Sequence, residues 1–275
     1  MSEVWLIGHP VAHSLSPAMH NAAFAKLGLP HRYEARDVEE KDLAGTLDRM
    51  RRADVLGVNV TIPHKEAALR LVDEASEEAR RVGALNTIVV RGGRLIGENT
   101  DKYGFEKALS DSGHTDSSGF MFAMNTVVVL GAGGAARACV LALLQHENSV
   151  IVANRDPARA EALVRAMEPF AVGDRTITVG PWPEGRFRAD GVVNATPLGL
   201  GGEDPLERAE LPVFVVDLVP TAVETPLVKR AKATEYVTVV DGLSMLLHQA
   251  ARSFELWTGT AAPLEVMRAA LPRRA

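Results

Sequence analysis

Residues 127–136 constrain the fold of this chain more than any other segment. Four β-prone apolar residues lead directly into Gly131-Ala132-Gly133-Gly134, and a helical stretch follows as far as Gln145. A strand, a tight glycine turn and a helix start in this order are typical of a doubly wound parallel sheet that binds a dinucleotide. Gly131 permits the turn, Gly133 lets the backbone approach a pyrophosphate, and the helix start offers free N–H groups to the phosphates. The segment therefore predicts a dinucleotide site.

The next apolar run indicates which dinucleotide binds. Residues 149–153 end at Asn154 and Arg155, and Arg159 follows one helical turn later. An NAD site usually carries Asp or Glu about 20 residues after the glycines, to accept the ribose 2′-hydroxyl, whereas cations suit a 2′-phosphate. This pattern favours NADP(H). Asp156 leaves NAD open, because its carboxylate could repel a phosphate or accept a ribose hydroxyl.

A second segment of the chain predicts a proton-transfer pair. The apolar run at 55–60 is followed by Pro63 and Lys65, which indicates a strand, a tight turn and a helix with Pro63 near its first position. Lys65 would then lie at the rim of a sheet, where α/β proteins bind their ligands. Asp101 is the carboxylate proposed to accompany it, since burial and charge pairing can tune both groups for proton transfer.

Composition limits the other classes of function. The chain has 275 residues, 47% of them apolar, a net charge of −5 and a pI near 5.9, which gives no sign of a nucleic-acid partner. Cys139 is the only cysteine, so no disulfide forms within the chain, as is typical of the cytoplasm. No apolar run reaches membrane-spanning length, the first residues lack a secretion signal, and the histidines lack metal-ligand spacing. We expect a cytoplasmic protein without a bound metal.

Strands and helices alternate along the chain, which predicts an α/β protein of two domains. In the first, a helix at 17–27 capped by Ser16 follows the first strand, and a hairpin around 91–94 makes the sheet mixed. In the second, six strands between 127 and 241 predict a Rossmann-like parallel sheet. A polar stretch at 112–119 is a candidate connection, and the apolar patch at 120–124 has no functional interpretation.

Eight motifs in order make the whole chain resemble the shikimate dehydrogenase family. One of them is Asn59-Val60-Thr61-Ile62-Pro63-His64-Lys65. The full set lies at residues 8–21, 59–65, 83–87, 97–101, 131–137, 154–155, 194–199 and 242–249. The resemblance implies reversible reduction of 3-dehydroshikimate to shikimate with NADPH. It also implies a substrate domain at 1–104 with the C-terminal helices at 242–275, an NADP domain at 105–241, and a monomer or homodimer.

The same resemblance implies roles for particular residues. It makes Lys65 and Asp101 the catalytic pair, and places the substrate carboxylate at Ser14 and Ser16. The substrate hydroxyls would be held by Asn59, Thr61, Asn86, Asp101 and Gln249. Short amides and hydroxyls suit a polyhydroxylated ring, because they offer both donors and acceptors. The implied cofactor-binding residues are Gly131, Ala132, Gly133, Gly134, Ala135, Asn154, Arg155, Arg159, Thr196, Leu218 and Gly242.

Two departures from the family pattern keep alternatives open. Pro220 stands where the family usually has a substrate-contacting Tyr, and Asp156 stands where NADP-binding members favour Thr or Ser. One alternative is therefore a dehydrogenase for quinate or an aminated shikimate that uses NAD or both cofactors. A second alternative is a non-catalytic shikimate-sensing protein, against which the intact pair of Lys65 and Asp101 argues.

Overall fold

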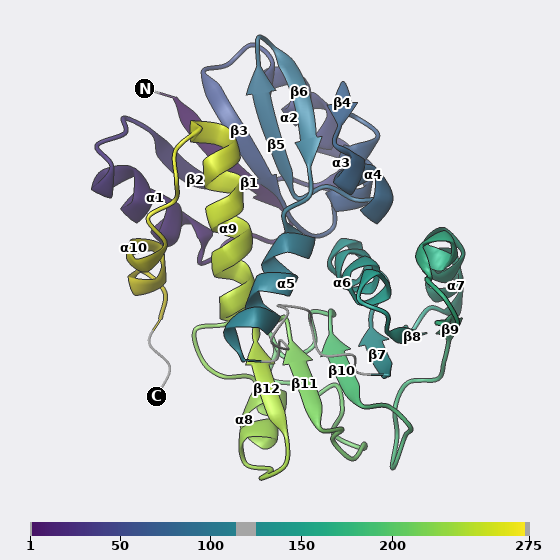
Figure 1. The fold of residues 1–275 in the computed structure, drawn as a ribbon. Helices are drawn as coiled ribbons and strands as arrows, with labels where there is room; N and C mark the ends of the chain where they lie inside the picture. Colours follow the sequence, from purple (N-terminus) through teal and green to yellow (C-terminus); the bar gives the residue numbers. More distant parts are fainter. Residues whose placement is uncertain (1, 114–124, 273–275) are drawn as a thin grey trace. The chain divides into compact units, whose positions relative to one another are not determined.

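The structure, a computed structural model, describes residues 2–113 and 125–272 and divides the chain into two compact units (Figure 1). The first unit comprises Met1–Gly104 and Leu246–Pro272, and the second comprises Phe105–Met245. The apolar patch at 120–124 and most of the expected connection at 112–119 lie outside the described residues.

The sheet of the first unit is mixed, as the hairpin predicted. Its strand order is β2-β1-β3-β5-β6-β4. Strand β1 pairs in parallel with β2 and β3, whereas β5 is antiparallel to both β3 and β6. The strands are β1 Glu3–Gly8, β2 Arg32–Asp37, β3 Val55–Val60, β4 Glu74–Ala75, β5 Thr87–Arg91 and β6 Arg94–Glu98. The short edge strand β4 was not predicted, because two residues carry no measurable alternation.

Helices surround this sheet and connect its strands. They are α1 Ser16–Lys26, the 3-10 turn η1 Glu40–Asp42, α2 Leu43–Met50, α3 Lys65–Leu69, α4 Glu77–Val82, α5 Asp101–Asp111, α9 Gly242–Thr258 and α10 Leu264–Ala269. Two of them, α5 and α9, each contain a division between the units.

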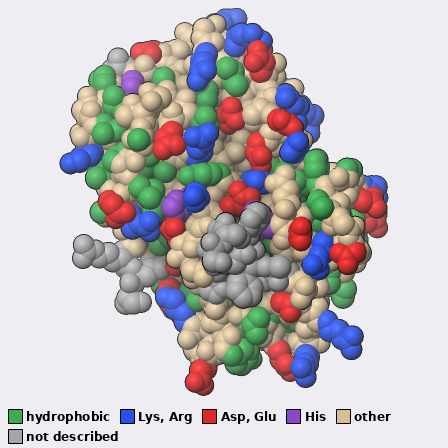
Figure 2. Space-filling model, viewed as in Figure 1, with side chains coloured by type: hydrophobic (Ala, Val, Ile, Leu, Met, Phe, Trp, Pro, Cys, Tyr) green, Lys and Arg blue, Asp and Glu red, His purple; other side chains and the backbone are tan. Residues whose placement is uncertain are grey.

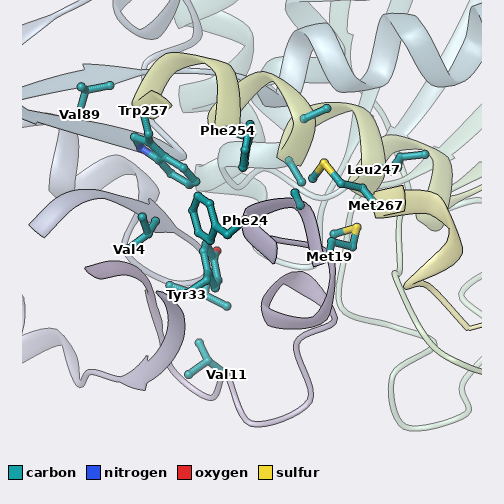
Figure 3. Packing of buried hydrophobic residues seen from close by; sticks show 14 residues of the cluster. Val4, Val11, Met19, Phe24, Tyr33, Val89, Leu247, Phe254, Trp257 and Met267 are labelled. Carbon is teal, nitrogen blue, oxygen red and sulfur yellow. The ribbon is translucent and has the colours of Figure 1, made fainter. Parts of the chain in front are cut away.

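An aromatic cluster anchors α9 on the first unit. Phe254 and Trp257 of α9 are buried against Phe24 of α1 and Tyr33 of β2 (Figure 3). The Trp257 indole N–H donates to the carbonyl of Ile88 at 3.0 Å, so the ring is fixed by a hydrogen bond as well as by packing. This arrangement brings a helix from the end of the chain onto the sheet built by the first hundred residues.

Two local expectations for the first unit are wrong. Ser16 is the first residue of α1 rather than its cap, because its hydroxyl hydrogen-bonds the buried Tyr33. The Ser14 hydroxyl instead accepts from the Ser16 N–H at 3.3 Å. Pro63 lies before α3 rather than in it, because the N–H of His64 first closes a turn onto the carbonyl of Thr61.

The second unit carries the predicted parallel sheet. Its strand order, β9-β8-β7-β10-β11-β12, is the doubly wound order in which the chain reverses direction between β7 and β10. The strands are β7 Thr126–Leu130, β8 Ser149–Ala153, β9 Ile177–Val179, β10 Gly191–Asn194, β11 Phe214–Asp217 and β12 Thr238–Asp241. Its helices are α6 Gly134–Gln145, α7 Pro157–Met167, η2 Glu168–Phe170 and α8 Pro226–Lys232. Ligands of such sheets bind beyond the carboxyl ends of strands at this reversal.

Charged side chains of both signs are interspersed over the face of the molecule that Figure 2 shows. This mixture fits the small net charge of −5. Among the described residues, no helix combines the length and the apolar character that a membrane crossing requires.

His20 of α1 is a polar group enclosed by the aromatic cluster. It is fully buried and stacks on Tyr33, with 4.3 Å between ring centroids and 11° between the ring planes. Neither ring nitrogen has a hydrogen-bond partner among the described residues. Burial lowers the pKa of His20 from 6.5 to about 3, because the charged imidazolium would lose its hydration. The folded protein therefore keeps this ring neutral.

Replacing His20 with Phe should reduce the acid sensitivity of folding. As the pH falls below 6.5, the unfolded chain binds a proton at His20 while the folded chain does not until about pH 3, so wild-type stability falls across this window. One such group changes the free energy of unfolding by about 1.4 kcal/mol per pH unit. Urea unfolding across the upper part of the window measures the slope. His13→Phe, at an exposed histidine, should keep the wild-type slope, and an unchanged slope in His20→Phe would contradict this account.

Candidate active site

Lys65 and Asp101 form a shielded ion pair in the first unit. The Lys65 Nζ lies 2.5 Å from Asp101 Oδ2, and the two side chains are 13% and 5% exposed. The other carboxylate oxygen, Oδ1, accepts from Asn86 Nδ2 at 2.9 Å. Because each carboxylate oxygen has its own donor, the orientation of Asp101 is set from two directions. The structure thus brings together the two residues that the sequence proposed as a pair.

Local structure positions each member of the pair at the start of a helix. Lys65 opens α3, and the preceding His64 is buried, with its Nε2 2.6 Å from the carbonyl oxygen of Val38. Asp101 opens α5, where Asn99 Oδ1 accepts from the N–H groups of Asp101 and Lys102. Asn99 was not singled out from the sequence, although an Asn just before a helix is a recognisable capping signal.

Asn86 connects the pair to Gln249 on α9. Its Oδ1 accepts from the Thr100 N–H at 2.7 Å, and its Nδ2 also lies 3.1 Å from Gln249 Oε1. The Gln249 Nε2 in turn donates to the carbonyl of Leu246 at 3.0 Å. Two of the predicted substrate-binding amides therefore bind each other in this structure.

Asn59 is held by a residue that the sequence interpretation missed. The Tyr33 hydroxyl donates to Asn59 Oδ1 at 2.8 Å, and Asn59 Nδ2 donates to the carbonyl of Asn86 at 3.1 Å. Burial raises the pKa of the Tyr33 phenol, so the group stays a donor. Tyr33 also hydrogen-bonds Ser16 and so joins two predicted substrate-binding residues. Its available signal was its position as the lone aromatic in a charged strand, facing the core.

Ser14 and Thr61 complete the predicted set in the first unit. Ser14 is half-buried just before α1, and Thr61 directly follows β3, where its N–H donates to the carbonyl of Ile7 at 2.9 Å. No hydrogen bond from the Thr61 hydroxyl is formed with the described residues, so that hydroxyl is available to a ligand.

The glycine loop of the second unit has the geometry that its motif predicted. Gly131 adopts a φ of +106°, and a Cβ added there would lie 3.1 Å from the carbonyl oxygen of Ala195. Gly133 precedes α6, and a Cβ added there would meet no protein atom within 4 Å. Ala136 is fully buried in the packing of α6 on the sheet. Open space therefore lies beside a helix start, as a pyrophosphate requires.

Asp156, in the segment after β8, caps the following helix α7. Its carboxylate accepts from the Ala158 N–H at 3.0 Å and so caps α7, while its carbonyl accepts from Asn154 Nδ2 at 2.8 Å. Arg155 and Arg159 are both exposed. Thr and Ser are also favoured capping residues, which explains in physical terms how Asp can replace them here.

The remaining predicted cofactor residues follow the carboxyl ends of neighbouring strands. Thr196 Oγ1 donates to Asn194 Oδ1 at 2.6 Å, just beyond β10. Gly242 begins α9, and a Cβ added there would lie 2.6 Å from the carbonyl oxygen of Leu218. Asn194 Nδ2 also donates to the buried Asp217 at 2.8 Å, which fixes the end of β11. Neither Asn194 nor Asp217 was proposed from the sequence as a scaffold for this edge.

Residues 2–113 and 125–272 contain no group of three or more His, Cys, Asp and Glu side chains suited to hold a metal ion.

Comparison with known proteins identifies the family. The chain matches the shikimate dehydrogenase substrate binding domain over residues 6–88, shikimate / quinate 5-dehydrogenase over 116–178, and the shikimate 5'-dehydrogenase C-terminal domain over 242–271. It is 43% identical to shikimate dehydrogenase (NADP(+)) of Methanopyrus kandleri, over 98% of this chain and 94% of that protein. This chain belongs to the shikimate dehydrogenase family.

Solved structures of shikimate dehydrogenase family members share its architecture. The Thermus thermophilus shikimate 5-dehydrogenase in complex with NADP(H) and shikimate is 40% identical, with a TM-score of 0.82 and 98% of each chain covered. A quinate dehydrogenase from Corynebacterium glutamicum in complex with NAD is 31% identical, with a TM-score of 0.81 and 98% of each chain covered. The family and the two-domain α/β fold predicted from the sequence are therefore confirmed.

Proposed function

We propose that this chain catalyses the reversible reduction of 3-dehydroshikimate to shikimate, with NADPH as the hydride donor. The buried ion pair of Lys65 and Asp101, joined at 2.5 Å, carries the proposal. A ketone reduction needs a proton at the developing alkoxide, and a shielded ammonium held by a fixed carboxylate is suited to supply it. Family membership and the open glycine loop of the second unit support the hydride half of the reaction.

The chemistry divides between cofactor and protein. Bound NADPH supplies a hydride to the carbonyl carbon of the substrate. Lys65 donates a proton from Nζ to the carbonyl oxygen, so that the ketone gains one hydride and one proton and becomes the alcohol. Asp101 holds Nζ in position before transfer. In the reverse direction, Lys65 accepts the hydroxyl proton of shikimate.

The first unit binds the substrate in this proposal. Ser14 and Ser16 would hold the carboxylate, whose charge suits hydroxyl and backbone N–H donors. The ring hydroxyls would be held by Asn59, Thr61, Asn86, Asp101 and Gln249. The amides of Asn86 and Gln249 bind each other at 3.1 Å, so ring hydroxyls would exchange for that bond.

The second unit binds NADP(H) in this proposal. The backbone of Gly131, Gly133 and their neighbours would receive the pyrophosphate at the start of α6. Arg155 and Arg159 would bind the 2′-phosphate, and the capping bond made by Asp156 supports this assignment because it turns that carboxylate to the helix. The other proposed cofactor-binding residues are Ala132, Gly134, Ala135, Asn154, Thr196, Leu218 and Gly242.

Arg155→Ala should weaken the use of NADP+ without weakening the use of NAD+. Loss of one charge-assisted hydrogen bond to the 2′-phosphate should lower kcat/KM for NADP+ by about tenfold or more. Initial rates of shikimate oxidation with each cofactor measure the effect. Arg165→Ala provides the matched control, because Arg165 lies further along α7 and pairs with Glu161 at 3.4 Å. An equal loss with both cofactors would contradict the assignment.

A comparison of two substrates and two cofactors tests the proposed activity. Initial rates on shikimate and quinate, each with NADP+ and with NAD+, should give the highest kcat/KM for shikimate with NADP+. The alternative is a quinate dehydrogenase, favoured by Pro220, which offers no hydroxyl where the family pattern has Tyr. Highest kcat/KM for quinate with NAD+ would support that alternative. Shikimate binding without turnover would instead support the non-catalytic sensor.

The protein is further proposed to act in the cytoplasm as a monomer or homodimer, without a nucleic-acid or membrane partner. Its modest negative charge and single buried cysteine support this setting. Light scattering coupled to size-exclusion chromatography would distinguish the two oligomeric states.

A further inference from the structure

A buried hydroxyl on α9 lies at the centre of the polar network behind the Lys65–Asp101 pair. The Ser253 side chain is fully buried, and its Oγ donates to the carbonyl of Gln249 at 2.9 Å. The same oxygen lies 2.7 Å from Thr87 Oγ1, 3.1 Å from Thr100 Oγ1 and 3.1 Å from Asn59 Nδ2. The Ser253 hydroxyl, on a helix near the C-terminus, thus contacts side chains of β3, β5 and the loop before α5.

The proton inventory of this cluster makes Ser253 an acceptor. A serine hydroxyl has one proton and two lone pairs, and here the proton is directed to the Gln249 carbonyl. Its two lone pairs can accept from two of its three neighbours, and we assign them to Thr87, the shortest contact, and to Asn59. The Thr87 hydroxyl has a second acceptor, Asn86 Oδ1, but that contact is longer, at 3.2 Å against 2.7 Å to Ser253.

The Thr100 N–H determines which way the Asn86 amide faces, and Ser253 keeps the Thr87 hydroxyl from competing for the same oxygen. With the Thr87 proton directed to Ser253, Asn86 Oδ1 is left for the Thr100 N–H at 2.7 Å. The amide then has its Nδ2 on the opposite side, where it donates to Asp101 Oδ1 at 2.9 Å. A flipped amide would place its oxygen against the carboxylate and would release Asp101 from one of its two donors.

We propose that Ser253 is a positioning residue for the active site. By accepting from Thr87 and Asn59, it keeps the Thr87 hydroxyl from drawing on Asn86 Oδ1, so that the Asn86 amide stays in place to donate to Asp101. The residue itself is fully buried and acts only through these neighbours. The inference rests on the proposed function, because the hydrogen bonds around Ser253 matter for catalysis only if Lys65 and Asp101 are the proton-transfer pair.

Ser253→Ala removes the acceptor while leaving the helix and its apolar packing in place. We expect kcat to fall and the KM for shikimate to rise, with kcat/KM lower by about tenfold, as is usual for coupling within one hydrogen-bond network. Thr258→Val is the matched control, because Thr258 also lies on α9 and donates to a carbonyl four residues earlier, that of Phe254, at 2.8 Å. That variant should keep both wild-type constants. A variant that is only less stable would lose active protein without a change in KM.

A second variant tests whether the effect travels through the network. Thr87→Val removes the donor that faces Ser253, and the double variant with Ser253→Ala removes both. If both act through Asn86, the double variant should lose no more kcat/KM than the more damaging single variant. Losses that multiply across the two positions would overturn the proposal.

A crystal structure of Ser253→Ala gives a readout that is independent of turnover. We expect the Thr87 hydroxyl to turn to Asn86 Oδ1, shortening that 3.2 Å contact and displacing the Asn86 amide from Asp101 Oδ1. Unchanged Thr87–Asn86 and Asn86–Asp101 contacts together with wild-type KM would overturn the proposal. Wild-type protein without turnover on any substrate would instead count against the proposed function. In that case the crystal structure of the variant still decides the role of Ser253.

Discussion

Lys65→Ala should lower kcat for shikimate oxidation by about 100- to 10,000-fold, the usual contribution of a positioned proton-transfer group. The KM for shikimate should change little, because the remaining hydroxyls and amides of the first unit still bind the ring. The effect is large because the Lys65 side chain is only 13% exposed, so water has poor access to replace its ammonium. Steady-state kinetics at saturating NADP+ separate the two constants.

A matched lysine variant tests whether the loss is specific. Lys41→Ala removes an exposed ammonium from the same unit, paired with Glu39 at 2.7 Å, and should retain wild-type kcat and KM. A raised KM with kcat unchanged in Lys65→Ala would show that Lys65 binds substrate without transferring a proton.

Asp101→Asn should damage both activity and stability. An asparagine can turn its oxygen toward Lys65 or toward Asn86, but its amide nitrogen then faces the other donor. Breaking a buried ion pair in this way lowers the free energy of unfolding by about 3 kcal/mol. Without the carboxylate, Lys65 loses its orientation, and kcat/KM should fall about 100-fold or more. Urea unfolding and steady-state kinetics measure the two effects.

Asp111→Asn offers a control at the other end of α5. Asp111 is exposed, so the same change of charge and shape should leave both the free energy of unfolding and kcat/KM close to wild type. If Asp101→Asn retained wild-type kcat/KM, the carboxylate would have no part in holding the proton donor.

The elements that carry local signals were predictable from the sequence. The glycine turn at Gly131, the hairpin around 91–94 and the strand–turn–helix segment before Lys65 each depend on residues close together in the chain. Those signals predicted both sheets and the strand ends from which the candidate site is built. The pairing of Lys65 with Asp101 was proposed from their residue types and from the family resemblance, and the structure places the two side chains 2.5 Å apart.

The support around the pair was not predictable in the same way. Tyr33 and Asn59 are 26 residues apart, and Thr87 and Ser253 are 166 apart, so no local pattern joins them. Ser253 occurs four residues after Gln249 in an apolar helix, where a lone serine is common and carries no functional signal. Asp156 shows the opposite case, since its carboxylate suggested electrostatics with a cofactor and instead caps a helix.

The contact between Asn86 and Gln249 has a consequence for selectivity among ring compounds. A buried polar group usually rejects an analogue that lacks its partner, because the group is then stranded without a hydrogen bond. Here the two amides lie 3.1 Å apart and can pair again whenever a ligand leaves them unfilled. A deoxy analogue should therefore lose less affinity, relative to the substrate, than it would lose at a site whose polar groups could not pair with each other. Discrimination would then depend less on the number of hydroxyl groups that the ring carries.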